Sequence, residues 1–204
     1  MWNGECRAGR AGNKFLNLNF KIHIMKPLIQ NPDPQIPNHV CVDVHYRESH
    51  AIAAGLLFSN WNDDHITGLH LACIGHSKPY KPGKFFEREL PCILQVLNKI
   101  RVPIDVVVID GYVWLDKNFP GLGTHVYHAL GGKIPVIGVA KSKFREALHA
   151  QKVFRGRSSR PLYITAIGID PNFAANCIKQ MHGKFRIPTL LKKVDCLCRD
   201  WQKI

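Results

Sequence analysis

Alternating apolar and polar positions predict a β-strand where the regular part of the chain begins. In "VCVDVHY", residues 40–46, valine occupies every second position and Asp43 falls on the opposite face. Two further apolar segments follow at 51–61 and 65–75, joined through the polar turn "NWNDDH". Together, the three segments predict an antiparallel meander.

Helical and strand patterns alternate along the rest of the chain. The segment "GKFFERELPCILQVLNKI" (83–100) has the apolar spacing of a helix, and we expect Pro91 to kink it or to mark its first turn. Strands are predicted at 105–110, 134–140 and 161–170, and helices at 123–131, 171–182 and 186–201. Three antiparallel strands followed by alternating helices and strands predict an α/β fold, with one mixed sheet flanked by helices.

The first 35 residues lack this regular pattern. Residues 1–24 are rich in Gly, Asn and Arg, and a proline-spaced linker follows Met25. We expect 1–35 to be a flexible basic extension and linker, or the true start to be Met25, and 36–204 to form one folded domain. No apolar signal-peptide core and no membrane-length apolar run is present, so neither export nor membrane insertion is expected.

The charge of the chain favours a polyanionic partner. The 28 Lys and Arg residues exceed the 15 Asp and Glu residues and give a net charge of +13. Counterion release and electrostatic steering make such a surface suitable for nucleic acid. Anionic lipid would satisfy the same charge, but no basic amphipathic helix stands out. Nucleic acid is therefore the expected partner.

The cysteines give no sign of a disulfide framework or a zinc site. There are 7, an odd number, most lie in apolar segments, and no CxxC pair occurs. This pattern is typical of buried, reduced thiols in a cytoplasmic protein.

Three acidic residues occupy positions where a carboxylate is costly. Asp43 lies among valines in a strand, Glu89 lies in an apolar helix, and Asp110 ends a buried-type strand. Each needs a cation, hydrogen-bond donors or a metal. If the two strands are neighbours, Asp43 and Asp110 share one end of the sheet. Such ligands suit Mg²⁺ or Mn²⁺, and two ions about 4 Å apart support phosphodiester hydrolysis.

Taken singly, these acids also have simpler interpretations. Asp110 and Gly111 form an ordinary turn pair at a strand end, and Glu89 beside Arg88 can belong to a solvated helix face. Asp43 is the hardest of the three to explain without a function. The spacing alone therefore suggests a metal site without specifying one.

Six motifs in order resemble the endonuclease V family, whose members are inosine-directed nucleases with a ribonuclease H-like fold. The similarity spans about 36–200, so that 36–204 is expected to be an endonuclease V-like nuclease domain. The motifs are "VDVHY" around Asp43, "KPYKPGKFFERE" at 78–89, "VVVIDG" at 106–111, "GLGTH" at 121–125, "IPVIGVAKS" at 134–142 and "PLYITAIG" at 161–168. Each is weak alone, and the ordered set is strong.

The resemblance implies roles for particular residues. The divalent-metal carboxylates of the family fall on Asp43, Glu89 and Asp110, and a lysine near the scissile phosphate falls on Lys141. The wedge that enters nucleic acid at the lesion falls on Tyr80, Lys81, Pro82 and Gly83, although Tyr80 also suits surface packing. Lys143 belongs to a basic stretch expected to contact the backbone, and Gly111 would let the substrate pass close.

The sequence departs from the family pattern at three places. Asp116 stands where the family usually has a histidine, with Val113 where a glycine is usual. After the "PLY" strand the chain reads Gly168-Ile169-Asp170 without the usual histidine, so Asp170 is a candidate fourth catalytic acid. The middle wedge residue is Lys81, not an apolar one. His125 matches the family and is expected to be structural.

The sequence therefore predicts a Mg²⁺-dependent endonuclease, with Mn²⁺ as the other suitable metal. The resemblance implies hydrolysis of a phosphodiester on the 3′ side of a deaminated purine, inosine, in DNA repair, by a monomer. One alternative is a nuclease of the same fold acting on inosine-containing RNA or branched DNA, kept open by Val113 and Asp116. The other is a nucleic-acid-binding module that does not cut.

Overall fold

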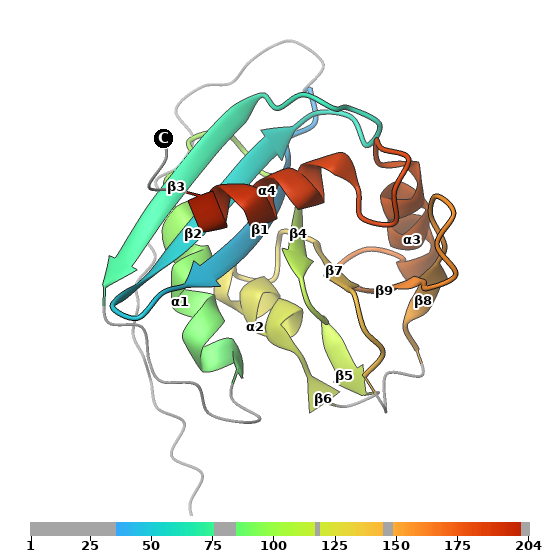
Figure 1. Cartoon of the computed structure of the whole chain (residues 1–204). Coiled ribbons are helices and arrows are strands. Elements are labelled where there is room, and N and C mark those ends of the chain that lie inside the picture. The colour runs from blue at the N-terminus through green and yellow to red at the C-terminus, as the bar shows by residue number, and fades with distance from the viewer. Residues whose placement is uncertain (1–35, 76–84, 117–118, 145–148, 201–204) are drawn as a thin grey trace, which may run out of the picture.

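A mixed seven-stranded sheet forms the centre of the molecule (Figure 1). The structure, a computed structural model, describes residues 36–75, 85–116, 119–144 and 149–200. From one edge to the other, the strands are β3 (Gly68–Gly75), β2 (His50–Phe58), β1 (His39–Tyr46), β4 (Val106–Asp110), β7 (Val136–Ala140), β9 (Leu162–Ile167) and β8 (Gln151–Val153).

The pairing of β1 with β4 brings the two predicted strand acids to one end of the sheet. β3, β2 and β1 form the expected antiparallel meander, and β1 is parallel to β4 with Val42 opposite Ile109. The residues that follow this pair are Asp43 and Asp110. Because β1 and β4 are parallel neighbours in this register, the two acids lie side by side where β4 ends.

The predicted fold class is confirmed, with one difference in strand direction. β4 and β7 are parallel, as expected, but β9 runs antiparallel to β7 and pairs with β8 on its other side. The short strand β8 escaped prediction because three residues carry too little periodicity. The same holds for β5 (Trp114–Asp116) and β6 (Phe119–Pro120), which pair in a separate small hairpin.

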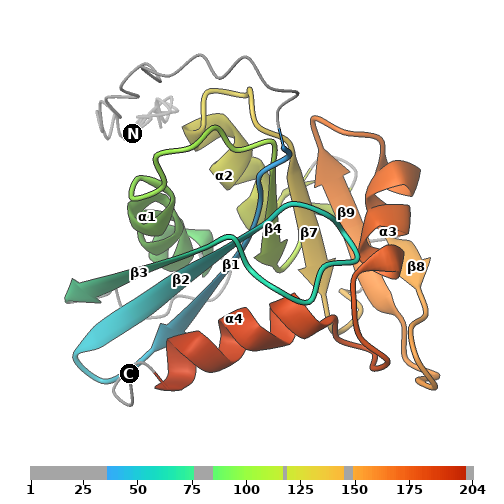
Figure 2. The ribbon, with the colours of Figure 1, turned by 90° about the horizontal axis from the view of Figure 1, so that it is seen from above.

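Helices cover both faces of the sheet (Figure 2). On one face, α1 (Phe85–Leu97) and α2 (Leu122–Ala129) bury side chains such as Ile93 and Val126 against Val40 and Val107. On the other, α3 (Pro171–Gln180) and α4 (Thr189–Asp200) pack Ile178, Leu190 and Val194 against Val108, Ile137 and Leu162. The alternation of strand side chains supplies an apolar set to each layer.

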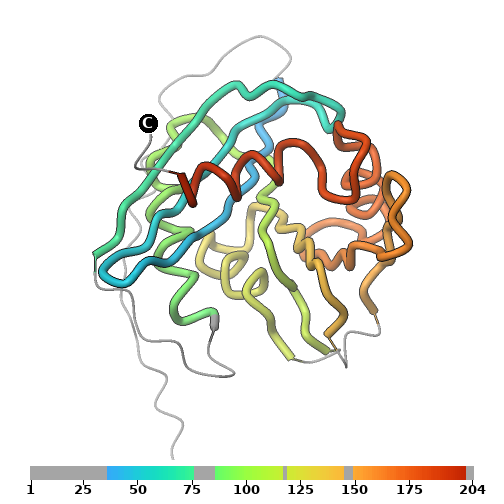
Figure 3. Tube along the Cα trace, in the orientation of Figure 1, coloured from blue at the N-terminus to red at the C-terminus, as the bar shows by residue number. Residues whose placement is uncertain are grey.

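Two details of the helices bear on the pocket described below. Pro91 lies inside α1 and not in its first turn, on an exposed position. α4 crosses β1 and β2 diagonally, so that the last helix of the described chain lies over its first two strands (Figure 3). Residues from opposite ends of the chain can therefore meet at the end of β1.

Candidate active site

A pocket opens where β4 and β7 end beside the second half of β1, between α1 on one side and α4 on the other. Its lining includes four acids, Asp43, Glu89, Asp110 and Asp195, and four basic residues, Lys141, Lys143, Arg199 and His45. Gly111, Tyr112 and Phe144 complete much of the wall. The structure thus brings together the three predicted metal carboxylates, Lys141, Lys143 and Gly111. Their roles in binding or catalysis remain predictions.

Two hydrogen bonds hold Asp43 in the pocket, one from the next residue of β1 and one from a side chain of α4. The amide of Val44 donates to Asp43 Oδ1 at 2.8 Å, and the thiol of Cys198 on α4 donates to the carbonyl oxygen of Asp43 at 3.1 Å. Burial, and then the negative charge of Asp110, raise the pKa of Asp43 to about 6. The carboxylate is therefore poorly compensated when it is charged.

Glu89 faces the pocket from α1 and is only 6% exposed. Burial raises its pKa to about 8, although a hydrogen bond with the Tyr46 side chain acts in the opposite direction. The Tyr46 ring is fixed in turn by the guanidinium of Arg88, whose Cζ lies 3.4 Å from the ring centroid. With this pKa, Glu89 is largely neutral near pH 7, and a nearby cation would stabilise its charged form.

Lys141, which follows β7, forms an ion pair with Asp110 at the end of β4. Lys141 Nζ lies 2.5 Å from Asp110 Oδ2, and both side chains are partly exposed. Burial favours a lower pKa for Lys141, but the hydrogen bond and charge of Asp110 outweigh it and raise the pKa. Gly111 follows with a φ of 142°, a conformation that favours glycine.

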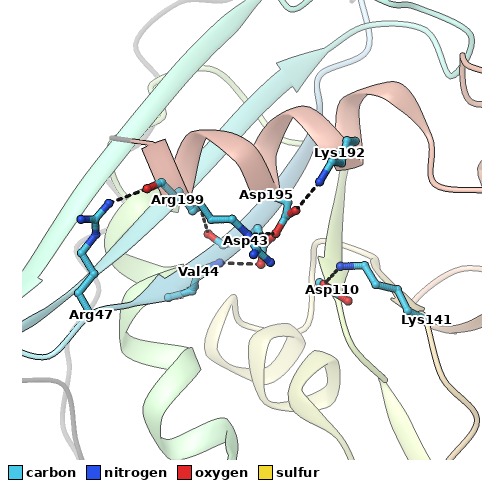
Figure 4. Close-up of polar contacts among 9 residues, drawn as sticks. Asp43, Val44, Arg47, Asp110, Lys141, Lys192, Asp195 and Arg199 are labelled. Carbon is cyan, nitrogen blue, oxygen red and sulfur yellow. Dashed lines mark hydrogen bonds and ion pairs between the residues drawn. The ribbon is translucent and has the colours of Figure 1, made fainter. Parts of the chain in front are cut away.

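Asp195 on α4 is the pocket acid that sequence reasoning missed. It forms ion pairs with Arg199 Nε at 2.9 Å and Lys192 Nζ at 3.2 Å, and it projects toward Asp43 (Figure 4). Burial acts to raise its pKa, but these two hydrogen bonds lower it. In the sequence, this spacing resembles a surface salt-bridge pattern. The available signal was its position between Val194 and Cys198, at the border of the apolar face of the helix.

Two of the four pocket acids, Asp110 and Asp195, are paired with the protein's own cations. In the described part of the chain, no group of three His, Cys, Asp or Glu side chains is already arranged to hold a metal ion. Lys141 is paired with Asp110, and Lys192 and Arg199 are paired with Asp195. The donor set nevertheless fits Mg²⁺ or Mn²⁺, because all four pocket acids offer carboxylate oxygen.

Other predicted site residues lie outside the pocket lining. Asp170 caps α3, where its Oδ1 accepts a hydrogen bond from the amide of Phe173 at 2.8 Å. Asp116 lies on β5 opposite Phe119. Val113 is fully buried, and its Cγ2 lies 2.6 Å from where a Cβ on Gly123 would stand. Tyr80, Lys81, Pro82 and Gly83 fall outside the described residues.

His125 has the structural environment that the sequence led us to expect. Its ring stacks on Phe86 of α1, with centroids 3.7 Å apart and an interplanar angle of 11°. Burial, followed by the charge of His128, lowers the pKa of His125. The stack joins α2 to the helix that carries Glu89.

A mixed sheet of this topology, with an acidic pocket at the ends of its central strands, defines a ribonuclease H-like protein. The sequence model of the endonuclease V family matches residues 25–196, and the chain belongs to this family. Among the helices of the described residues, none has the length and apolar character needed to cross a bilayer.

Similar sequences and structures carry the same family name. Endonuclease V of Rippkaea orientalis is 26% identical over 181 residues, covering 78% of each chain. The Streptomyces avermitilis protein is 31% identical over 144 residues, covering 60% of this chain and 62% of its own. The structure of human endonuclease V superposes with a TM-score of 0.66 at 22% identity, over 84% of this chain and 87% of that one.

A further structure contains nucleic acid. Ciona intestinalis endonuclease V, in complex with a 24mer DNA containing an inosine followed by a ribo-adenosine, superposes with a TM-score of 0.71 at 19% identity. The match covers 83% of this chain and 87% of that one.

Proposed function

We propose that this protein is a divalent-metal-dependent endonuclease acting on nucleic acid that contains inosine, with hydrolysis of a phosphodiester on the 3′ side of the lesion, in DNA repair. The observation that carries the proposal is the meeting of Asp43, Glu89, Asp110 and Asp195 with Lys141 in one pocket. Family membership and the inosine-containing DNA bound to the Ciona intestinalis protein support the substrate class.

The four acids would hold Mg²⁺ or Mn²⁺. When bound, such ions supply Lewis-acid stabilisation of charge at the scissile phosphate and make the attacking water more acidic. Asp43 on β1 and Asp110 at the end of β4 would share ions. Glu89 on α1 and Asp195 on α4 would complete the set. The raised pKa values of Asp43 and Glu89 support this assignment, since cations favour their charged forms.

Lys141 would have two partners. Its ammonium group pairs with Asp110 in this structure. With Asp110 among the residues that would hold the metal, the ammonium group would pair with a phosphate oxygen of the substrate strand. Gly111 beside it carries no side chain, so the strand can approach the end of β4 closely.

A second candidate substrate is inosine-containing RNA or branched DNA. Val113 is buried against Gly123 where the family usually has a glycine, and Asp116 replaces the usual histidine nearby. A carboxylate accepts hydrogen bonds from base N–H groups, whereas a neutral histidine can also donate, so the base preference can differ. A module that does not cut is disfavoured, because it would have no use for four acids in one pocket.

One cleavage assay tests the proposal. Matched DNA and RNA strands, each with or without a single inosine, are incubated with Mg²⁺ and the wild-type protein or Asp43→Ala. We expect inosine-dependent cutting that Asp43→Ala abolishes, with products mapped by length to the 3′ side of inosine. Cutting unchanged in Asp43→Ala would refute the metal mechanism. Cutting without regard to inosine would remove the repair function, and binding without cutting would favour the inactive module.

A further inference from the structure

Two neighbouring loops near the β8 edge of the sheet expose aromatic side chains. Phe154 follows β8 and is 56% exposed, and Phe185, between α3 and α4, is 69% exposed. Arg157 and Lys184 are exposed beside them. The Lys184 ammonium lies 5.6 Å from the Phe185 ring centroid. We call these four residues, Phe154, Arg157, Lys184 and Phe185, the aromatic strip.

Arg155 joins the two loops into one surface. It is only 6% exposed, and its guanidinium donates to the carbonyl oxygens of Lys179, Met181, Gly183, Phe185 and Arg186. Gly156 lies so close to the second loop that a Cβ there would be 2.3 Å from Lys184 O. Figures 2 and 3 show the loops running side by side. A buried arginine therefore holds together the two loops that carry the aromatic strip.

The surroundings of the aromatic strip are strongly basic. Between residues 149 and 194 the only acid is Asp170, at the N-terminus of α3. The same segment holds nine basic residues: Lys152, Arg155, Arg157, Arg160, Lys179, Lys184, Arg186, Lys192 and Lys193. Exposed aromatic rings in such a field suit a partner that offers both flat apolar groups and negative charge.

Arg186 links the aromatic strip to the pocket. It follows Phe185 directly, and its guanidinium donates to the carbonyl oxygens of Lys141 and Pro161, the latter at 2.8 Å. Lys141 lines the pocket through its ammonium group. One side chain therefore connects the loop that carries Phe185 to the backbone of a residue in the proposed active site.

We propose that the aromatic strip binds single-stranded nucleic acid, with bases stacked on Phe154 and Phe185 and phosphates paired with Arg157 and Lys184. The inference extends the proposed function and rests on it for the link between this strand and the one that is cut. Stacking on aromatic rings requires unpaired bases, because paired bases already stack on their neighbours. The substrate would therefore be unpaired on the side of the lesion that lies over the strip.

A binding assay without metal tests the aromatic strip independently of cleavage. Fluorescence anisotropy with the full chain in EDTA measures the affinity for a labelled single-stranded oligothymidylate, for the uridine RNA equivalent, and for an oligomer of abasic sites. We expect the Phe154→Ala/Phe185→Ala variant to bind both base-containing strands about 10-fold more weakly or worse. It should bind the abasic strand and a DNA duplex as the wild type does.

Phe173→Ala is the matched control. Phe173 is 55% exposed and lies in the first turn of α3, which follows the Ile167 end of β9. Phe154 lies at the opposite end of β9, because the preceding residue, Val153, pairs with Leu162. Substitution of Phe173 should leave every affinity unchanged. A Phe154→Tyr/Phe185→Tyr variant should retain wild-type binding. Arg157→Gln should reduce the slope of log affinity against log salt by about 0.7.

The outcomes separate the two proposals. Unchanged binding by Phe154→Ala/Phe185→Ala, or equal losses for abasic and base-containing strands, would overturn the stacking surface, whatever the cleavage assay shows. Base-dependent binding that the tyrosine variant restores would support it, even if the protein does not cut at inosine. If only one of the DNA and RNA strands depends on Phe154 and Phe185, that strand is the partner of the strip.

Discussion

At Glu89, the burial of a carboxyl group has consequences for stability. Burial raises its folded-state pKa to about 8, far above the roughly 4.3 of an exposed glutamate. The folded state therefore holds this proton over a pH range in which the unfolded chain releases it. In metal-free protein, Glu89 therefore lowers the free energy of unfolding. This loss of stability is absent below about pH 4, grows as the pH rises, and is complete above about pH 8.

Replacement of Glu89 by glutamine should remove this pH dependence. We expect Glu89→Gln to be more stable than the wild type in EDTA at pH 8, by a few kcal/mol, and close to it at pH 4.5. Urea unfolding at the two pH values gives the comparison. Glu87→Gln, two residues away in the same helix, is the control. An equal stability difference at both pH values would contradict the assigned cause.

Lys141 should affect metal binding and catalysis in opposite directions. Lys141→Met removes the cation paired with Asp110, so Mg²⁺ should bind as tightly as in the wild type or more tightly. Cleavage should nevertheless slow by about 100-fold, because a cation near the scissile phosphate is lost. Calorimetric titration with Mg²⁺ and single-turnover cleavage separate the two effects. Weaker Mg²⁺ binding would show that Lys141 supports the acids in another way.

At the scale of residues, the sequence identifies acids in strands better than acids in helices. Asp43 and Asp110 stand out because a charged residue beside valines breaks a strand pattern that has only two faces. Asp195 does not, since a helix has a wide polar surface and the neighbouring cations offer a simpler explanation. Asp170 attracts attention because the family's usual histidine is missing at this place, and in the structure Asp170 caps a helix.

α4 is the element on which the pocket depends most. Its apolar face covers β1 and β2 through Leu190, Val194 and Cys198, and this packing fixes Asp195 next to Asp43. Near the C-terminus of α4, the Arg47 guanidinium donates to the carbonyl oxygen of Arg199 at 2.6 Å. The packing of α4 on the sheet therefore positions Asp195 in the pocket.

Arg155 should be essential for the connection between α3 and α4. Arg155→Met would leave several buried carbonyl groups without donors and should destabilise the protein by about 3 kcal/mol or more, measured by urea unfolding. Arg155→Lys supplies fewer donors and should recover only part of this. Arg157→Met, two residues away on an exposed position, should change stability by less than about 0.5 kcal/mol. Equal effects at the two positions would exclude a specific role.

Long periodic elements are predictable from the sequence, whereas elements defined by tertiary contact are not. β1, β2 and α1 lie close to their predicted ranges, because each is long and its apolar residues are buried between the sheet and its helices. The hairpin of β5 and β6 is shaped instead by contacts with distant residues. Its first strand follows Val113, whose amide donates to Thr165 Oγ1 at 2.8 Å. No local periodicity encodes such a contact.

For the molecule as a whole, the pocket gathers residues from four separate elements. The antiparallel meander supplies Asp43, the strand beyond it supplies Asp110, and helices from opposite faces of the sheet supply Glu89 and Asp195. The proposed ligands come from four separate elements, so metal binding would depend on the folding of the entire domain. The unfolded chain cannot assemble this set.

Divalent metal should therefore raise the melting temperature. Mg²⁺ at about 100 times its dissociation constant should stabilise the folded state by about 2.7 kcal/mol, which corresponds to roughly 5–10 °C for a domain of this size. EDTA should reverse the shift, and Asp43→Asn should abolish it. Asp64→Asn, an exposed acid in the turn after β2, should retain it. A shift that survives Asp43→Asn would place the metal elsewhere.

The late position of α4 has a consequence for the synthesis of the protein. Chains emerge from the ribosome N-terminus first, so β1 and β2 appear well before the helix that covers them. Until α4 follows, Cys41, Ala54 and Leu56 lack their final cover, and the pocket lacks Asp195. The pocket can therefore be complete only once α4 has emerged from the exit tunnel and has packed against β1 and β2.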